Sequence, residues 1–413
     1  MAGLRLLIVS IGALVWGIST DWPAVTLVAS CALLMTAIAW LWSRWCLSGI
    51  AFSRRVTSDK LQVGDVLTER LRLENRSAVP KLFIELDDHT SLISHRANRV
   101  VGMAGHSARE WDAESVVRER GRHRLGPVSI RSGDPIGLFR RVRRITGAID
   151  ITVYPLSVPL DQYSPMSALQ SGGGVIQRRS TIPTATVGGI RDYTIGDSIN
   201  RISWTATARA GHLMVKEFEI DPTADLWVVL DLYALTEALT TPSDWDIRSD
   251  NQMLWLGNTF EYRIMLTCSL VRRTLELGRS VGLVINAPQT LVLSPERSDR
   301  QFVRILEALA VAQPVPNATL LDVLSGTQHR FARDSAVVAI TSHPTDEVAS
   351  LLGHLRRRTI SPELVIVGEG MQSADVPFAA VANRIPCYRL TRFDNPAIAL
   401  NSALLFASSG GVG

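Results

Sequence analysis

Two apolar runs open the chain, and neither contains a charged side chain. They are Leu6–Ile18 and Pro23–Trp42, and a short polar turn at Thr20–Asp21 joins them. The second run has 20 residues. A helix that rises about 1.5 Å per residue needs about this length to cross roughly 30 Å of hydrocarbon. Residues 1–45 are therefore predicted to form a transmembrane helical hairpin.

Two other interpretations of this N-terminal segment fit the pattern less well. A cleaved signal peptide would explain Arg5 and the short first run, but no Ala-x-Ala cleavage site follows. Val28–Cys31 resembles a bacterial lipoprotein cleavage box, yet apolar sequence continues well past Cys31. The hairpin is the interpretation that accounts for both runs.

The charges beside the two runs predict how the hairpin is oriented. Arg5 flanks one end, Arg44, Arg54 and Arg55 follow the other, and only Asp21 lies in the turn between them. Cytoplasmic flanks of membrane helices carry an excess of Lys and Arg. Both termini and the whole globular part are thus expected on the cytoplasmic side of the membrane.

Residues 56–155 show the period-two alternation that is typical of strands. Glu69–Glu74 and Ile149–Tyr154 alternate, Lys81–Leu86 is a run of β-favouring residues, and glycine-rich and polar turns lie between them. This pattern predicts a β-sandwich-like domain. Residues 156–188, which include Ser171–Gly174, are predicted to be a flexible linker because Gly, Ser, Thr, Gln and Pro dominate them.

From residue 225 the pattern changes to compact apolar strands separated by amphipathic helices. The strands are Leu226–Leu230, Ser280–Ile285, Ala336–Ile340 and Leu364–Val367, and the helices are Phe260–Leu277, Ser298–Ala312 and Thr345–Arg357. Near-continuous apolar strands indicate a parallel sheet covered on both faces. Residues 225–410 are predicted to form an α/β domain, which makes the chain an α+β multidomain protein.

The segment 189–220, called the signature segment below, is dense in opposed charges. Gly196 permits a tight turn, Asp197 is a good N-cap, and a helix from Ser198 to Ala210 would end at Gly211. Arg191, Asp192, Arg201, Arg209, Lys216 and Glu217 surround a single tryptophan, Trp204. We expect a structural joint between the two domains, with the Trp204 indole buried.

This segment closely resembles the signature of the domain-of-unknown-function 58 family of bacterial membrane-anchored proteins. A second block, Arg120–Pro127 followed by Asp134–Phe139, resembles the family as well, whereas Ile195 and Thr205 depart from its pattern. The residues that match, and that are candidates for a structural or interaction role, are Arg191, Tyr193, Gly196, Asp197, Arg201, Trp204, Arg209, Lys216, Asp134, Pro135 and Gly137.

The resemblance implies a fold, a location and a partner. The family pairs a two-helix anchor and a β-rich segment with a von Willebrand factor A-like, Rossmann-like domain. Its genes often neighbour those of MoxR-type AAA+ ATPases, which implies a chaperone or assembly system. The location expected from it is the bacterial plasma (inner) membrane, with the lipid bilayer and a MoxR-type ATPase as partners.

A metal-ion-dependent adhesion site of the A-domain type can be tested on the sequence. Such a site carries Asp-x-Ser-x-Ser after the first strand, a distant Thr and a later Asp. The chain has Asp231 but Tyr233 and Leu235 in place of the serines, Thr319 as the candidate threonine, and no acid in Ile340–His343, where the later strand ends. This set supplies too few oxygen ligands for Mg²⁺. The site is predicted to be degenerate, with Asp231 capping nearby N–H groups.

Composition excludes several other classes of function. The net charge is +4, but residues beyond 55 are almost neutral, so nucleic acid is not an expected partner. No Gly-Lys pair, no Cys-x-x-Cys and no His-x-x-x-His occurs, which argues against a Walker A loop, a zinc knuckle and a zincin site. No catalytic residue and no cofactor are expected.

We therefore expect a membrane-anchored, non-enzymatic scaffold or adaptor that works with a MoxR-type AAA+ ATPase in protein or complex assembly. The alternatives are an enzyme or accessory subunit that acts on envelope substrates, and a metal-dependent adhesion-type binding domain. An enzyme would need a nucleophile–base pair, and neither Cys268 nor Cys387 has a histidine nearby in the sequence.

Overall fold

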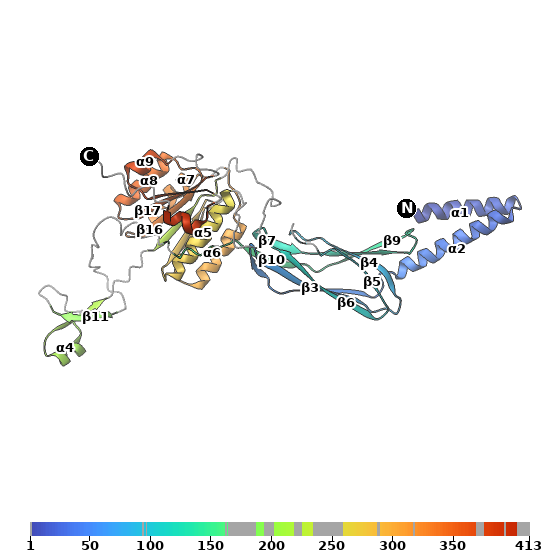
Figure 1. The fold of residues 1–413 in the computed structure, drawn as a ribbon, viewed down its shortest axis with the longest axis horizontal. Helices are drawn as coiled ribbons and strands as arrows, with labels where there is room; N and C mark the ends of the chain where they lie inside the picture. Colours follow the sequence, from blue (N-terminus) through green and yellow to red (C-terminus); the bar gives the residue numbers. More distant parts are fainter. Residues whose placement is uncertain are drawn as a thin grey trace. The chain divides into compact units, whose positions relative to one another are not determined.

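The structure of the chain is a computed structural model. It describes residues 2–92, 95, 97–161, 163, 187–193, 202–218, 225–233, 259–286, 290–316, 319–368, 376–391 and 394–402. The chain divides into two compact units, of which the first contains Met1–Ser157 and the second most of the chain from Val158 onward. Each unit is described by itself (Figure 1).

The first unit begins with two helices that pack side by side in opposite directions, α1 (Ala2–Ser19) and α2 (Pro23–Trp45) (Figure 1). The Trp22 amide donates to the Gly17 carbonyl at 3.0 Å and closes the turn, and Pro23 occupies the first position of α2. Of the described helices, α2 is long and apolar enough to cross a membrane, and the apolar part of α1 is shorter. The predicted turn is confirmed, and the crossing stays a prediction.

The rest of the first unit is built from short strands. They are β1 (Ile50–Val56), β2 (Lys60–Gln62), β3 (Val66–Asn75), β4 (Lys81–Asp88), β5 (Arg99–Met103), β6 (Ser107–Val116), β7 (Gly121–Leu125), β8 (Val128–Gly133), β9 (Arg140–Ile145) and β10 (Ile149–Tyr154). They form three sheets with the orders β1-β3-β6, β5-β4-β8-β9 and β2-β10-β7. The pairing is antiparallel except between β2 and β10. The two strands predicted by alternation are confirmed as β3 and β10, and the predicted β-rich run is confirmed as β4.

Two of these sheets face each other across an apolar core. Leu73 of β3, Ile84 of β4 and Ile130 of β8 are completely buried there, and Cys46 and Leu47 just after α2 join them. The strand region therefore starts at Ile50, earlier than the predicted residue 56. The sequence hid this because β1 has three consecutive polar residues, Ser53–Arg55, in place of an alternating pattern, and begins only a few residues after α2.

The predicted linker at 156–188 is wrong in its first residues. Leu160 and Tyr163 are buried, and the Val158 amide donates to the Ser269 hydroxyl at 2.8 Å. These residues pack within the second unit because the otherwise polar stretch contains apolar side chains. Ser171–Gly174 lie outside the described residues.

The chain beyond Val158 contains a six-stranded sheet and several helices, all in the second unit except Arg304–Ala312, which belong to the first. In chain order they are β13 (Leu226–Leu230), α5 (Thr259–Glu276), β14 (Val281–Ile285), β15 (Leu291–Glu296), α6 (Asp299–Val311), α7 (Leu320–Thr327), the 3₁₀ turn η3 (Gln328–Arg330), β16 (Ala336–Thr341), α8 (Asp346–Arg357), β17 (Ser361–Gly368), α9 (Phe378–Ala382), β18 (Cys387–Thr391) and α10 (Pro396–Ser402). The four predicted strands and three predicted helices are confirmed, each with bounds within a few residues.

The strand order in this sheet is β15-β14-β13-β16-β17-β18. Only β15 runs antiparallel to its neighbour. Helices α7 and α8 cover one face, where Leu324 and Leu352 pack on Val229 and Val337. The order reverses at β13, so the carboxyl ends of β13 and its neighbours form the position where open α/β sheets bind ligands.

Candidate functional site

Asp231 follows β13 at this position, and its carboxylate is almost completely buried. One carboxylate oxygen accepts hydrogen bonds from the Asn286 amide at 2.8 Å and the Tyr233 backbone N–H at 2.9 Å. The other accepts from the Thr341 hydroxyl at 2.7 Å. Asn286 follows β14 and Thr341 ends β16, so three adjacent strands converge on this carboxylate. The prediction that Asp231 caps nearby N–H groups is confirmed.

A buried arginine completes the arrangement around Asp231. Arg263 of α5 has no exposed surface, and its guanidinium donates to the backbone carbonyl of Asp231 at 2.5 Å and of Tyr233 at 3.3 Å. A positive charge therefore lies at the end of β13, where an adhesion-type site would hold its cation. Among the described residues, the Asp231 carboxylate and the Thr341 hydroxyl are hydrogen-bonded to each other. One carboxylate and one hydroxyl do not fit the octahedral oxygen coordination shell of Mg²⁺.

Thr319 does not take the role of the distant threonine. It is the N-cap of α7, where its hydroxyl accepts from the Asp322 amide at 3.3 Å and donates to the Asp322 carboxylate at 2.7 Å. The threonine that contacts Asp231 is Thr341. The sequence contained a signal for Thr341 and Asn286, since each stands directly after a run of apolar strand residues.

The described part of the signature segment folds as β11 (Val187–Asp192), α4 (Trp204–Ala210) and β12 (Met214–Phe218), with β11 and β12 antiparallel. Gly211 ends α4 in the left-handed conformation with φ 74°, and its amide donates to Thr207 at 2.9 Å. The predicted Gly211 cap is thus confirmed. The predicted helix start at Ser198 is wrong, because Ile202 forms a β-bridge with Val215 and α4 begins at Trp204.

Trp204 is not a core residue of this segment. Its exposed fraction is 65%, whereas a joint built around the indole required burial. The register explains the difference, since the bridge between Ile202 and Val215 places Ile202 inside and leaves the first turn of α4 outward. Tryptophan is enriched among the residues that dominate binding energy in interfaces, which makes this face a candidate interaction surface.

The charges of the signature segment are only partly described. Asp192 pairs with His212 at 2.8 Å, Arg209 is exposed, and the Tyr193 amide donates to the Leu213 carbonyl at 2.9 Å. Gly196, Asp197 and Arg201 lie outside the described residues, as do the side chains of Arg191 and Lys216. The expected network of these arginines with Asp197 therefore stays a prediction.

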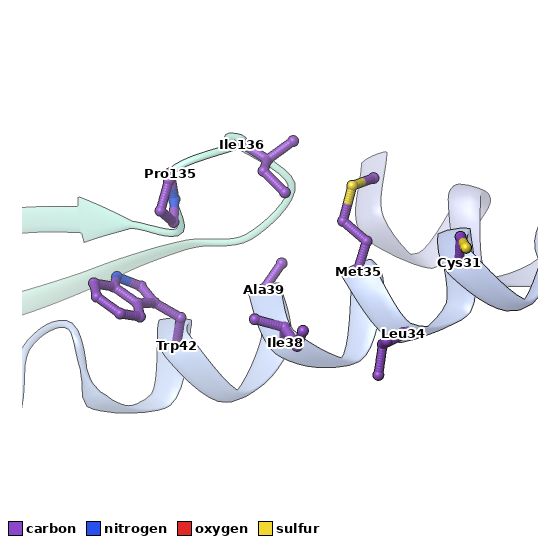
Figure 2. A pocket seen from close by; sticks show the side chains of 8 residues that line it. All are labelled: Cys31, Leu34, Met35, Ile38, Ala39, Trp42, Pro135 and Ile136. Carbon is purple, nitrogen blue, oxygen red and sulfur yellow. The ribbon is translucent and has the colours of Figure 1, made fainter.

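The second family-like block forms the loop between β8 and β9. Asp134 is buried and accepts hydrogen bonds from the amides of Ile136, Leu138 and Phe139 at 2.5–3.1 Å. Pro135 and Ile136 lie over α2 (Figure 2). Gly137 has φ 80°, a conformation that favours glycine. The matched residues Asp134, Pro135 and Gly137 are thus brought together, and they lie in the first unit, apart in the chain from the signature segment.

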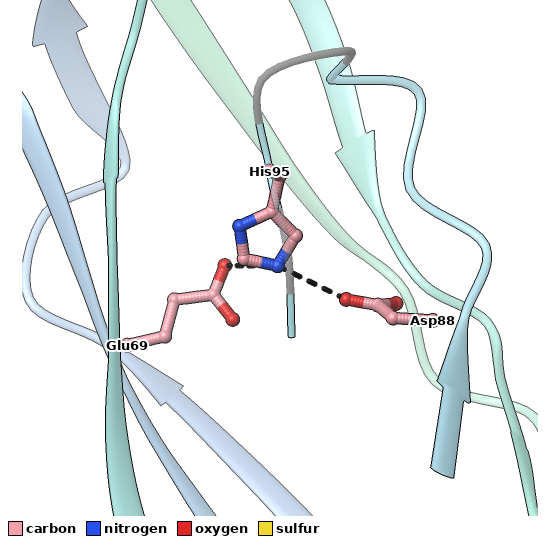
Figure 3. Close-up of side chains that lie close together, drawn as sticks. All are labelled: Glu69, Asp88 and His95. Atoms are coloured by element: carbon pink, nitrogen blue, oxygen red, sulfur yellow. Dashed lines mark hydrogen bonds and ion pairs between the residues drawn. The ribbon is translucent and has the colours of Figure 1, made fainter. Parts of the chain in front are cut away.

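A buried ionic cluster in the first unit was missed by the sequence analysis. The His95 Nε2 atom lies 3.1 Å from Asp88 and 3.7 Å from Glu69 (Figure 3). Arg54 contacts Asp88 and lies 3.2 Å from Glu69 through its Nε atom. At most 5% of each of these side chains is exposed. The residues come from β1, β3, β4 and a loop, so no local motif reveals them.

The pKa shifts of Glu69 and Asp88 and the charge of Arg54 bear on the role of this cluster. Burial raises the pKa of Glu69 despite the nearby charge of Arg54. Burial also acts upward on Asp88, but hydrogen bonds from His95 and Arg54 together with the Arg54 charge hold the Asp88 pKa below its usual value. The three potential ligand atoms of Glu69, Asp88 and His95 are close enough for a metal. The Arg54 guanidinium already supplies the positive charge, so the set fits an ionic tie between facing sheets better than a metal site.

Among the described cysteines, those of the second unit are poor nucleophiles. Cys268 and Cys387 have no exposed surface, and burial raises the pKa of Cys387 to about 12. A thiolate, which is the reactive form, is therefore suppressed at neutral pH.

Comparison with known proteins bears on the signature segment and the α/β domain. The family model "Protein of unknown function DUF58" matches residues 189–365, which confirms the resemblance derived from the sequence. The uncharacterized protein YeaD of Bacillus subtilis (strain 168) is 21% identical over 271 residues, or 63% of this chain and 62% of that protein. The chain thus spans less than two thirds of the length of this relative.

Solved structures resemble the chain only weakly. The CARDB domain of a Pyrococcus furiosus protein covers 25% of this chain and 91% of its own, with 8% identity and a TM-score of 0.19. The C-terminal domain of wzt covers 25% and 73%, with 9% identity and a TM-score of 0.20. Similarities of this size carry no inference about function.

Proposed function

We propose that this chain, whose residues 189–365 match the DUF58 family model, is a membrane-anchored, non-enzymatic adaptor that binds a protein partner through its signature segment. The partner proposed is a MoxR-type AAA+ ATPase, because the genes of the family often neighbour those of such ATPases. The adaptor works in the assembly of proteins or complexes at the membrane.

The exposure of Trp204 is the observation that carries this proposal. Tryptophan is enriched among the residues that dominate binding energy in protein interfaces. Leu213, which is 42% exposed, lies on the same small β11–α4–β12 unit. Two apolar side chains held outward by a defined cap and a paired strand form a surface that a partner can cover.

The chemistry at the end of the parallel sheet supports binding over catalysis. Both carboxylate oxygens of Asp231 accept hydrogen bonds, and Arg263 lies buried beside it. We infer a von Willebrand factor A-like domain in which this position is structural. The strand order, with one antiparallel strand at the edge, supports that inference.

Trp204→Ala is expected to abolish partner capture without changing stability. Truncating an exposed side chain removes little packing inside the fold, whereas truncating a hot-spot tryptophan costs about 2–4 kcal/mol of binding. The measurement is capture of the purified MoxR-type ATPase by the full chain in mild detergent, beside urea unfolding of the same samples.

Phe378→Ala is the matched control, because Phe378 of α9 is 79% exposed and lies outside the signature segment. It should capture the ATPase like the wild type. Undiminished capture by Trp204→Ala would refute the interaction surface, and a lowered unfolding midpoint would restore the structural joint.

The orientation proposed for the anchor is tested with reporters fused after residue 413. Arg5, Arg44, Arg54 and Arg55 outweigh Asp21 in the turn, so the fused end is expected in the cytoplasm. A fluorescent protein fused after residue 413 should be fluorescent. An alkaline phosphatase fused at the same position should be inactive, because it needs export to become active. Active phosphatase would reverse the proposed orientation.

A further inference from the structure

The loop between β8 and β9 and the helix α2 enclose an apolar groove of about 430 Å³ (Figure 2). Pro135 and Ile136 form one wall, and a stripe of α2 forms the other. The residues of the stripe are Cys31, Leu34, Met35, Ile38, Ala39 and Trp42. Apart from the Trp42 indole N–H and the weakly polar Cys31 thiol, every lining side chain is apolar, so the groove offers little hydrogen bonding to a polar ligand.

The loop is built to lie in an apolar environment. The amides of Ile136, Leu138 and Phe139 all donate to the Asp134 carboxylate, the Gly137 amide donates to the Asp134 carbonyl at 3.1 Å, and Pro135 has no amide hydrogen. Backbone N–H groups must be satisfied internally wherever water is excluded by lipid. The exposed Ile136 thus projects from a loop whose own N–H groups need no water.

The length of the groove matches one leaflet of a bilayer. The stripe runs from Cys31 to Trp42, which is about 16 Å along a helix that rises 1.5 Å per residue. Half of a hydrocarbon core that is roughly 30 Å thick is about 15 Å. Most of the stripe, from Met35 to Trp42, also lies on the C-terminal half of α2, the half that leads into the strand region.

Positive charges gather where this leaflet would meet water. The Lys81 ammonium donates to the Trp45 carbonyl at 2.6 Å, and the Arg143 guanidinium donates to the Ile50 carbonyl at 3.2 Å. Arg141 is opposite Ser132 in the β8–β9 pair. Burial raises the pKa of the Cys46 thiol, and the positive charge of Arg141 opposes this effect. Strand β9 adds two further exposed arginines, Arg140 and Arg144.

We propose that this groove binds one anionic phospholipid, with an acyl chain between Ile136 and α2 and the headgroup phosphate at the arginines of β9. The inference rests on the membrane anchoring in the proposed function. The apolar lining and the leaflet-long stripe select an acyl chain, and the arginines complement a negative headgroup. The bound lipid would hold the strand region against the membrane surface.

The test measures lipid retention by native mass spectrometry on the full chain in detergent. Phosphatidylglycerol and phosphatidylcholine with the same acyl chains are added in equal amounts. The wild type should retain one phosphatidylglycerol, about tenfold in preference to phosphatidylcholine. Ile136→Asp should lower retention of both lipids by about tenfold or more, because a charge then faces the acyl chain. Arg141→Gln should lower retention of phosphatidylglycerol alone.

Two control variants make the same kinds of substitution at exposed positions away from the groove. Val66 is 52% exposed against 53% for Ile136. It lies about nine residues, or roughly 30 Å, along β3 from the end that pairs with Ile50. Val66→Asp and the exposed Arg122→Gln on β7 should retain lipid like the wild type. If Ile136→Asp fails to fold, Ile136→Ser replaces it, with an expected loss of about threefold.

The proposal is overturned by wild-type retention in the folded Ile136 variants, by equal loss in Val66→Asp, or by equal retention of the two lipids. Membrane fractionation of the wild type separates this failure from that of the proposed anchoring. A chain that does not sediment with membranes refutes the anchor itself. A chain that sediments, yet shows retention indifferent to Ile136, refutes only the lipid site.

Discussion

Glu363→Gln is expected to stabilise the second unit at neutral and alkaline pH and to remove much of its pH dependence. Glu363 of β17 is buried, and the Tyr163 hydroxyl lies 2.7 Å from its carboxyl group. Burial raises the Glu363 pKa to about 8, against the opposing effect of the Tyr163 hydrogen bond. The carboxyl group is therefore mostly protonated in the folded chain at pH 7 and ionised in the unfolded chain.

The sign of the effect follows from proton linkage. A folded-state pKa above the unfolded value means that the folded chain binds more protons between the two pKa values. The contribution of Glu363 to stability is fully present below the unfolded pKa of about 4.3 and is lost as the pH rises towards 8. Glutamine keeps the neutral form at every pH, so the gain at pH 7 should be about 2–4 kcal/mol.

The measurement is urea unfolding, monitored by tryptophan fluorescence, between about pH 5 and pH 9. This range brackets the raised pKa of Glu363. Trp227 is a suitable reporter because it is buried in the same sheet and packs on Phe331. The exposed Glu347→Gln on α8 is the control and should leave the pH dependence unchanged. Equal pH slopes for wild type and Glu363→Gln would contradict an elevated pKa in the fold.

Arg54→Met is expected to destabilise the first unit by about 3–5 kcal/mol at pH 7. The substitution keeps an unbranched apolar stem but removes the guanidinium, which leaves Glu69 and Asp88 as two buried carboxylates with His95 beside them. Removing one partner of a buried ion pair strands the other in a place where water does not solvate it. The loss should be smaller at lower pH, because protonation neutralises the stranded carboxylates.

Arg72→Met is the matched control in the same sheets. Arg72 pairs with Glu110 at 2.9 Å, but about half of each side chain is exposed, and exposed pairs contribute roughly 0–1 kcal/mol. Urea unfolding of both variants gives the comparison. If Arg54→Met costs no more than Arg72→Met, the cluster is no ionic tie between the sheets.

Local pattern was sufficient for much of the α/β domain. Apolar runs such as Leu226–Leu230 and Ala336–Ile340 bury every residue in a parallel sheet, so each run was visible without knowledge of its neighbours. Asp231 was recognisable because it directly follows such a run. The edge strand β15 was missed because it alternates weakly, with Leu293 alone buried.

Whether Trp204 and the residues of the ionic cluster are buried could not be predicted from the local sequence pattern. The burial of Trp204 was predicted from the charges around it. In the fold, Ile202 is the buried residue of this segment, because it forms a β-bridge with the buried Val215, and Trp204 is exposed. Likewise Arg54, Glu69, Asp88 and His95 are polar residues scattered over three strands and a loop. Nothing in their sequence spacing distinguishes them from exposed charges.

Two apolar N-terminal helices, the alternation of strand and helix beyond residue 225, and the resemblance to the DUF58 family could all be recognised in the sequence alone. These properties follow from hydrophobic period and from short motifs, which act over a few residues. Only the tertiary structure decided that Thr341 and not Thr319 contacts Asp231, that the loop at Asp134 lies on α2, and that Glu363 is buried against Tyr163. Each of these is a contact between residues far apart in the chain, and such contacts are set by which strands become neighbours, a choice that no local pattern contains.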